Sequence, residues 1–390
     1  MRAQRRRVGL WLVGARGSVA TTAVVGLAAV RGRLADDAGL VCSHPALAGA
    51  DLPGLDEIVV GGHDVVDGTA RKRAEELAAG RVFPAALVPA TADELDAYDS
   101  WVRHGGHGGA SGQRELVLAL AADVREFSAE HGCDVVVVVN VSSTEPPAAP
   151  APELDDLALL RAAWDRGESP LPPSSVYAAA AFEAGAAFVD FTPSAGARLP
   201  AVAALAAERG LPWAGSDGKT GETLLKSVLA PMFVQRALRV RSWSGTNLLG
   251  GGDGATLADP AARASKTVSK ARGLEEMTGY EVEGQVHIDY VPDLGDWKTA
   301  WDHVSFEGFL GTPMTLQFTW QGCDSALAAP LVLDLARLTA LALRRGETGP
   351  LEALGFFFKD PATDGTVPHH DLGTQFADLV GWATGERVAP

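Results

Sequence analysis

The sequence has 390 residues, an apolar content of 47% and a formal net charge of −16 at pH 7. Because this length is long for one hydrophobic core, we expect a two-domain or discontinuous enzyme. The acidic charge argues against a nucleic-acid partner or an anionic membrane surface, and an anionic substrate would need a local positive pocket. Three cysteines without CxxC spacing suit a reducing cytoplasm, where we expect the protein to lie.

The first expected elements are a buried strand over Val8–Val13, a glycine turn and a helix over residues 19–31. This order is typical of the first unit of a dinucleotide-binding fold. Gly14 and Gly17 would let the backbone approach a pyrophosphate at the helix N-terminus. The G-x-G-x-x-G pattern is incomplete, so a plain tight turn is the alternative, but the strand context favours a cofactor site. Asp64, which follows a further strand, is the candidate partner of the ribose.

Short strands are expected next at 39–41 and 56–60, and an unbroken valine run at 134–139 predicts a central parallel strand. Helices are expected at 91–102, opened by a capping box, and at 114–131 and 174–184. This alternation predicts a doubly wound α/β fold. The polar residues 140–145 follow the valine strand, where such folds bind ligands; a Ser/Thr turn that caps the next segment is the alternative.

Residues 215–223 contain a Gly-Lys-Thr sequence that looks like a phosphate loop. Trp213 occupies the position at which a Walker motif requires glycine, so we reject a nucleotide triphosphatase. We expect Asp217 and Lys219 to line a cleft instead. Alternating segments at 282–290 and 314–320 then predict antiparallel strands, and a helix is expected at 327–345.

Lysine is scarce, with seven lysines among 33 basic residues, and six of the seven lie between positions 219 and 359. Because burial or neighbouring cations can lower the pKa of an ammonium, a retained lysine indicates proton transfer. Lys266 and Lys270 are four apart, so a phosphate would relieve their repulsion on a helix face; a solvated face is the alternative. Lys298 and Lys359 lie beside aromatic residues, where burial would lower their pKa; snorkelling at a core edge is the alternative.

With these residues assembled, the chain resembles the myo-inositol-1-phosphate synthase family, of the shorter archaeal and bacterial type. The resemblance implies a doubly wound Rossmann α/β domain made of residues 1–230 plus 326–390. It also implies an inserted α+β domain at 231–325 that serves catalysis and assembles a homotetramer. The ordered motifs that carry it span nearly the whole chain: LWLVGARGSVATT, VNVSSTEP, FVDFTPS, GSDGKTGETLLKSVLAPMF, NLLGGGDG, SKTVSK, GDWKTAWD, CDSALAAPLVLDLARL and FFFKDP.

The reaction that the resemblance implies converts D-glucose 6-phosphate to inositol 1-phosphate, also numbered inositol 3-phosphate. NAD+ oxidises carbon 5, the enolate at carbon 6 attacks the carbon 1 aldehyde, and the NADH formed reduces the ring ketone. NAD is therefore recycled. In this hypothesis Lys266 and Lys359 manage proton and charge at carbon 5, Lys298 polarises the carbon 1 carbonyl, and Lys270 helps to hold the phosphate. Lys226 alone among the six clustered lysines looks ordinary.

The family's site residues fall on two sets of positions in this sequence. The implied catalytic residues are Lys266, Lys270, Lys298, Lys359, Asn247 and Asp302. The implied cofactor-binding residues are Gly14, Ala15, Arg16, Gly17, Ser18, Val19, Asp64, Ser142, Thr144, Asp217, Thr220, Asp253, Asp324 and Ser325.

The chain departs from the family in one loop. Gly245 and Thr246 stand where relatives have Ser-Tyr, and Gly251 and Gly252 stand where relatives have Asn or Asp. A loop with fewer side-chain ligands leaves open whether a monovalent or divalent cation is required, and which sugar phosphate is the substrate. The alternatives are a paralogous cyclase for a related sugar phosphate, a simple NAD-dependent dehydrogenase, and a catalytically idle NAD-binding scaffold. Retention of all four lysines argues against the scaffold.

Overall fold

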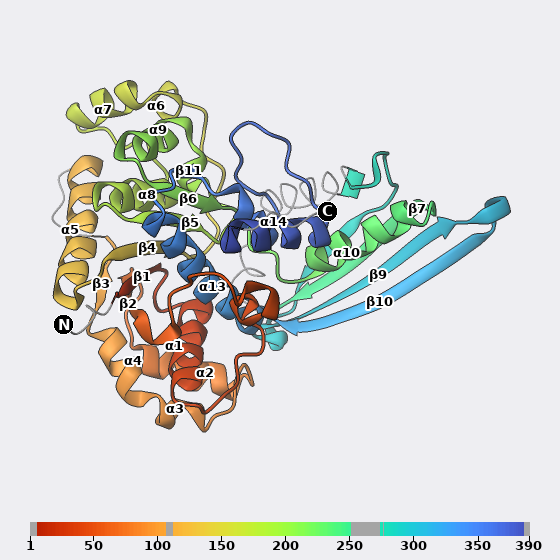
Figure 1. The fold of residues 1–390 in the computed structure, drawn as a ribbon, viewed down its shortest axis with the longest axis horizontal. Coiled ribbons are helices and arrows are strands. Elements are labelled where there is room, and N and C mark those ends of the chain that lie inside the picture. The colour runs from red at the N-terminus through yellow and green to blue at the C-terminus, as the bar shows by residue number, and fades with distance from the viewer. Residues whose placement is uncertain (1–5, 107–111, 251–273, 276, 386–390) are drawn as a thin grey trace.

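The computed structural model describes residues 6–106, 112–250, 274–275 and 277–385, which build two sheets (Figure 1). The first sheet has the strand order β11-β6-β5-β4-β1-β2-β3, and all its pairs are parallel. The order reverses between β1 and β4, the topological switch point at which doubly wound folds bind ligands. Its strands are β1 (Val8–Val13), β2 (Ile58–Asp64), β3 (Val102–His104), β4 (Val135–Asn140), β5 (Ala187–Asp190), β6 (Pro212–Gly215) and β11 (Gly349–Pro350).

Helices cover both faces of this sheet, and alternate residues of β1 face different cores. Leu10 and Leu12 pack on the side of α1 and α13, whereas Trp11 and Val13 pack on the side of α5 and α8. A strand buried on both faces is apolar throughout, as the sequence predicted. The helices are α1 (Ser18–Arg31), α2 (Ala70–Ala79), α3 (Leu87–Ala90), α4 (Ala92–Asp99), α5 (Gln113–His131), α6 (Pro152–Asp155), α7 (Leu157–Asp165), α8 (Pro173–Glu183), α9 (Pro200–Arg209), α10 (Glu222–Gln235), α13 (Asp324–Arg344) and α14 (Leu372–Thr384).

Helix α13 brings the chain back to the first sheet after the second has formed. Among the described helices it is the one long and apolar enough to cross a membrane, but 67% of its most apolar window is buried inside the protein. It packs along α1 and beneath the strands in the same core. Its N-terminus therefore lies close to that of α1, near the switch point.

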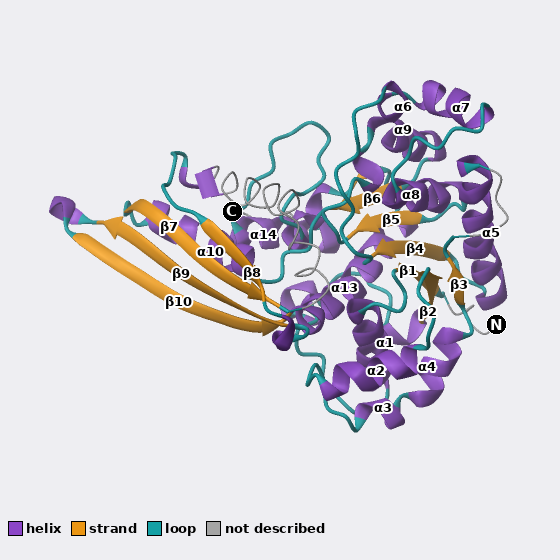
Figure 2. Ribbon diagram, turned by 180° about the vertical axis from the view of Figure 1, so that it is seen from behind, coloured by secondary structure: helices purple, strands orange, loops and turns teal. Residues whose placement is uncertain are grey.

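The second sheet has the order β10-β9-β7-β8 and extends away from the first as a long, curved ribbon (Figure 2). β9 pairs antiparallel with β10 and β7, and β7 pairs in parallel with β8. Helix α10 packs on one face through Phe233, which joins Trp243 and Val304 in a separate core. The strands are β7 (Arg239–Leu249), β8 (Val286–Tyr290), β9 (Trp297–Glu307) and β10 (Pro313–Cys323).

The strand expected at 39–41 is not formed, and Val41–Ser43 is instead one turn of 3-10 helix. The backbone amides of Val41 and Cys42 donate to the buried carboxylate of Asp334, at 2.6 and 3.1 Å. Because this carboxylate satisfies both donors, the segment does not join the sheet.

Two further expectations were wrong in detail. The helix expected at 91–102 ends at Asp99, and β3 follows it. The capping box is absent because the Thr91 hydroxyl donates to the Leu87 carbonyl at 2.9 Å, in the preceding turn. The segment 282–290 forms β8 only in its second half, and β8 is parallel to its neighbour rather than antiparallel.

Candidate active site

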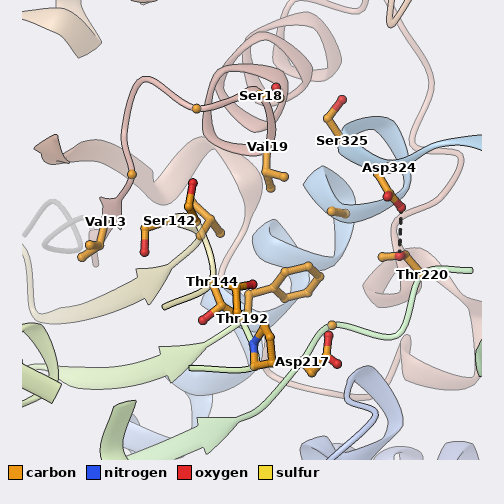
Figure 3. Close-up of a pocket in the computed structure, with 18 of the residues that line it drawn as sticks. Val13, Ser18, Val19, Ser142, Thr144, Thr192, Asp217, Thr220, Asp324 and Ser325 are labelled. Carbon is orange, nitrogen blue, oxygen red and sulfur yellow. Dashed lines mark hydrogen bonds between the residues drawn. The ribbon is translucent and has the colours of Figure 1, made fainter. Parts of the chain in front are cut away.

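A cavity of about 860 Å³ lies beyond the carboxyl ends of β1 and β4 (Figure 3). Residues of both sheets line it. Its walls come from the β1–α1 turn, the segments after β4 and β6, the start of α10, and the first residues of β9 and α13. The cavity therefore occupies the switch point, where the fold itself favours ligand binding. The predicted site residues that line it are Gly14, Arg16, Gly17, Ser18, Val19, Asp64, Ser142, Thr144, Asp217, Thr220, Asn247, Lys298, Asp324, Ser325 and Lys359.

The glycine turn brings backbone close to backbone at one side of the cavity. Gly14 has a φ of +86°, and a Cβ on it would lie 2.8 Å from the Ser142 Cα. Gly17 caps α1 without any side-chain hydrogen bond, and Gly17, Ser18 and Val19 line the cavity, so the first helical turn opens onto it. The buried Tyr98 hydroxyl donates to the Ala15 carbonyl at 2.7 Å and fixes the turn from below. An uncapped helix N-terminus beside a glycine cradle fits a pyrophosphate.

Asp64 ends β2 and is 7% exposed. One carboxylate oxygen accepts from the Arg16 amide at 2.6 Å, and the other accepts from the Val66 amide at 2.8 Å. These bonds hold the carboxylate on the cavity wall beside the start of α1. A carboxylate in this place is suited to the hydroxyls of a ribose.

A buried polar network joins the ends of β4 and β5. The Asn140 amide donates to Asp190 Oδ1 at 3.1 Å, and the Thr192 hydroxyl donates to the same oxygen at 2.7 Å. The Ser142 hydroxyl donates to Asn140 Oδ1 at 2.7 Å. Burial raises the pKa of Asp190 to about 7 despite these donors. The network fixes the cavity wall. Asp190, the last residue of β5, and Thr192, two residues later, were not among the predicted site residues, although they end an apolar strand.

Two cavity lysines each lie against a carboxylate. Lys359 Nζ is 2.7 Å from Asp217 Oδ1. Lys298 Nζ pairs with Asp324 Oδ1, which also accepts from the Thr220 hydroxyl at 3.4 Å (Figure 3). Each pair places an ammonium, and a carboxylate that balances its charge, on the wall of the same cavity. This arrangement can stabilise negative charge that develops on a bound oxygen.

Further polar groups join the two sheets at this cavity. The Ser325 hydroxyl donates to Asp296 at 2.8 Å, and the Ser18 hydroxyl donates to the other oxygen of Asp296 at 3.3 Å. The Trp297 indole donates to the Gly80 carbonyl at 3.0 Å. The chain at the start of β9 thus contacts the N-termini of both α1 and α13, and Lys298, the second residue of β9, enters the site from there.

Three predicted residues lie away from the cavity wall. Ala15 is fully buried beneath the turn. Asp302 is fully buried in β9, where it accepts from the Trp243 indole at 2.8 Å. Lys219 was expected in the cleft but is buried on the other side of its loop, where its ammonium donates to Gln375 at 2.5 Å. Burial lowers the pKa of Lys219 to about 8.

Lys266, Lys270 and Asp253 lie outside the described residues. Within the described part of the chain, no three His, Cys, Asp or Glu side chains converge in a way that could hold a metal ion. The cavity also has a buried acid that the sequence reasoning missed, Glu222, at the first position of α10. Its only sequence signal is its place directly after a glycine that opens a helix.

Comparison with known proteins points to one family. A family model for NAD binding, described as myo-inositol-1-phosphate synthase, matches residues 8–383. Inositol-3-phosphate synthase 1 of Bacteroides thetaiotaomicron is 35% identical over 402 residues, which cover 95% of this chain and 93% of the relative. Inositol-3-phosphate synthase 1 of Populus euphratica is 33% identical over 64% of this chain and 51% of its own length.

Two solved structures share the fold. Inositol-3-phosphate synthase from Caenorhabditis elegans superposes with a TM-score of 0.87 at 23% identity, over 98% of this chain and 86% of that one. A myo-inositol-1-phosphate synthase-related protein from Thermotoga maritima superposes with a TM-score of 0.79 at 24% identity, over 99% and 100% of the two chains. The α/β fold with a parallel central sheet and a second sheet is thereby confirmed.

Proposed function

Because the chain belongs to the myo-inositol-1-phosphate synthase family, we propose that it converts D-glucose 6-phosphate to inositol 1-phosphate, also numbered inositol 3-phosphate. The observation that carries this proposal is the union, in one cavity, of an uncapped glycine-turn helix and two lysine–carboxylate pairs. The helix N-terminus at the glycine turn suits the pyrophosphate of a dinucleotide, and the two lysines suit the oxygens of an enolisable sugar. Together they fit an oxidation that is coupled to cyclisation.

NAD is the cofactor that these residues fit. The backbone of the Gly14–Gly17 turn would hold its pyrophosphate, and the Asp64 carboxylate would accept from its ribose hydroxyls. A Cβ on Gly14 would collide with the Ser142 backbone that packs against this turn, so a larger residue there would distort the turn. When bound, NAD supplies the oxidation at carbon 5 and returns the hydride at the end, so net redox is zero.

Lys359 and Asp217 manage charge at carbon 5 in this scheme. The hydroxyl of carbon 5 must lose a proton, and the oxygen then becomes the anionic end of an enolate. Lys359, as a neutral amine, accepts that proton, and the ammonium so formed stabilises the oxygen as it becomes anionic. The Asp217 carboxylate balances the ammonium when the oxygen is neutral. Lys266, which lies outside the described residues, is proposed to share this task.

Lys298 polarises the carbon 1 carbonyl that the enolate attacks. A Cβ on Gly221 would lie only 2.8 Å from the Lys298 ammonium, so this glycine lets the cation approach the start of α10. The helix N-terminus and the ammonium both favour an anion, and we propose that the substrate phosphate binds here. Lys270, which is outside the described residues, is proposed to help hold that phosphate. When Lys298 contacts both the phosphate and the carbon 1 carbonyl oxygen of the substrate, the open-chain sugar is held in a bent conformation that favours ring closure.

We also propose a homotetramer in the cytoplasm, with Rossmann residues 1–230 plus 326–390 and a catalytic and assembly domain at 231–325. Trp301 is 43% exposed on β9, and Phe309 and Leu310 at the following hairpin are 88% and 87% exposed. Exposed apolar groups on an extended sheet are typical of interfaces. Sedimentation should give four times the mass of one 40.5 kDa chain; a monomer would contradict the assembly.

The function is tested by incubating the protein with glucose 6-phosphate and a catalytic amount of NAD+. We expect a periodate-labile inositol phosphate and no net absorbance from NADH. Net NADH release would indicate a simple dehydrogenase, and bound NAD without turnover of any hexose phosphate would indicate a scaffold.

A further inference from the structure

Glu222 is a buried acid on the wall of the cavity with a partner for each oxygen. Oε1 lies 2.6 Å from the Lys226 ammonium, one helical turn along α10. Oε2 accepts from the side-chain amide of Asn247 at 2.8 Å. The side chains of Glu222 and Lys226 are only 3% and 6% exposed. Lys226, which looked ordinary in the sequence, is thus an internal counter-ion.

The register of the second sheet explains why these groups meet. Alternate residues of β7 share the face that packs against α10, and they include Trp243 and Asn247. The Lys226 ammonium lies 5.6 Å from the centre of the Trp243 ring. Lys298 pairs with Leu249, two residues beyond Asn247, so its side chain leaves the same face nearer the cavity. Asn247 is therefore placed between the buried pair and the cavity lysine.

The charge on Glu222 determines which way the Asn247 amide faces. A carboxylate only accepts hydrogen bonds, so Asn247 must turn its NH2 group toward Glu222. A neutral amide at position 222 could donate or accept, and would permit both orientations. The buried carboxylate is stable only with a counter-charge, which Lys226 provides. Asn247 then has its amide oxygen left to offer a ligand.

We propose that Glu222, neutralised by Lys226, is a positioning residue that fixes the Asn247 amide so that its oxygen accepts a hydrogen bond from a hydroxyl of the bound sugar phosphate. The inference rests on the proposed function and assigns this side of the site to the sugar hydroxyls. A site built to accept from a hydroxyl discriminates strongly against analogues that lack it.

The test is a cycle of variants measured as kcat/KM for glucose 6-phosphate. E222Q/K226M removes both charges at nearly constant volume. Proteins often tolerate this replacement of a buried ion pair without loss of stability. It should lower kcat/KM by about tenfold, because the amide orientation is no longer fixed. N247A should lower it at least as much. In the N247A background, E222Q/K226M should cause no further loss, since Glu222 acts only through Asn247.

The matched control is E208Q/R161M, which removes an exposed ion pair on the first sheet's helices and should leave kcat/KM unchanged. NAD affinity, from quenching of tryptophan fluorescence, should be equal in all variants, which separates positioning from unfolding. If the combined variant loses kcat/KM by the product of the factors seen for E222Q/K226M and for N247A, Glu222 does not act through Asn247 and the positioning role is overturned. So would a kcat/KM of E222Q/K226M within about twofold of wild type. Wild-type protein that makes no inositol phosphate would instead overturn the proposed function, and the inference with it.

Discussion

The Lys359 ammonium lies 2.7 Å from the Asp217 carboxylate, although the two residues are 142 positions apart. Their backbones are also joined, because the Lys359 amide donates to the Asp217 carbonyl at 2.7 Å. The loop after β6 and the segment before α14 are therefore one unit at the site. The group that contacts the Asp217 carboxylate is thus an amine, which can exchange a proton, and not a guanidinium, which cannot.

Arginine should not replace the cavity lysines. K359R keeps the charge but brings a guanidinium that does not give up its proton, and K298R brings a wider planar group to a place where the ammonium already lies close to Gly221. In both variants kcat should fall by at least about 100-fold. Cofactor affinity should stay within about twofold, because neither side chain belongs to the glycine turn. K72R, on the exposed surface of α2, is the control and should have normal kcat. Steady-state kinetics of the three variants decide this, and an active K359R would remove Lys359 from the proton-handling role.

Two glycine variants should separate cofactor binding from general stability. G14A puts a Cβ at a φ of +86° and 2.8 Å from Ser142 Cα, so NAD binding should be lost and the free energy of unfolding should fall by about 1–3 kcal/mol. G26A, inside α1 with no atom close to the new Cβ, should raise the free energy of unfolding by about 0.5–1 kcal/mol and leave NAD binding intact. Calorimetry and cofactor titration measure both. Unchanged NAD affinity in G14A would place the pyrophosphate elsewhere.

Asp190 should make stability depend on pH. Burial raises the pKa of Asp190 from 3.8 to about 7, so the folded state holds a proton that the unfolded chain releases. The stabilisation that this proton gives to the folded state is fully present below about pH 4 and is lost as pH rises through about 7. Over this range the free energy of unfolding falls with a slope of up to about 1.4 kcal/mol per pH unit. Denaturant unfolding between pH 4 and 8 should show that the free energy of unfolding of wild type falls relative to that of D190N as pH rises to about 7. A difference that is independent of pH would contradict this.

Much of the fold could be predicted because its signals are local. The apolar run at Val8–Val13 is buried throughout, as are residues 136–139 of the valine run, and the glycine turn follows the first run as expected. The segment at 39–41 was mistaken for a strand because its amides are satisfied by Asp334, almost 300 positions later. Local pattern carries no information about such a partner.

Residues of the candidate site that belong to a sequence motif could be predicted to lie together. A residue that reaches the site only through a contact with a distant strand could not. Lys298, Lys359, Asp217 and Asp324 all line the cavity as the resemblance implied. No sequence pattern marked Glu222. Its place in the site depends on its hydrogen bond with Asn247, which β7 brings to α10.

In the proposed reaction, one hydride leaves carbon 5 and returns to the same carbon within one active site. The most direct measurement uses glucose 6-phosphate deuterated at carbon 5, NAD+ at a small fraction of the substrate concentration, and mass spectrometry of the product. We expect an inositol phosphate that keeps its deuterium, in amounts far exceeding the NAD+ supplied. Product that stops at the amount of NAD+, or that has lost the deuterium, would contradict it.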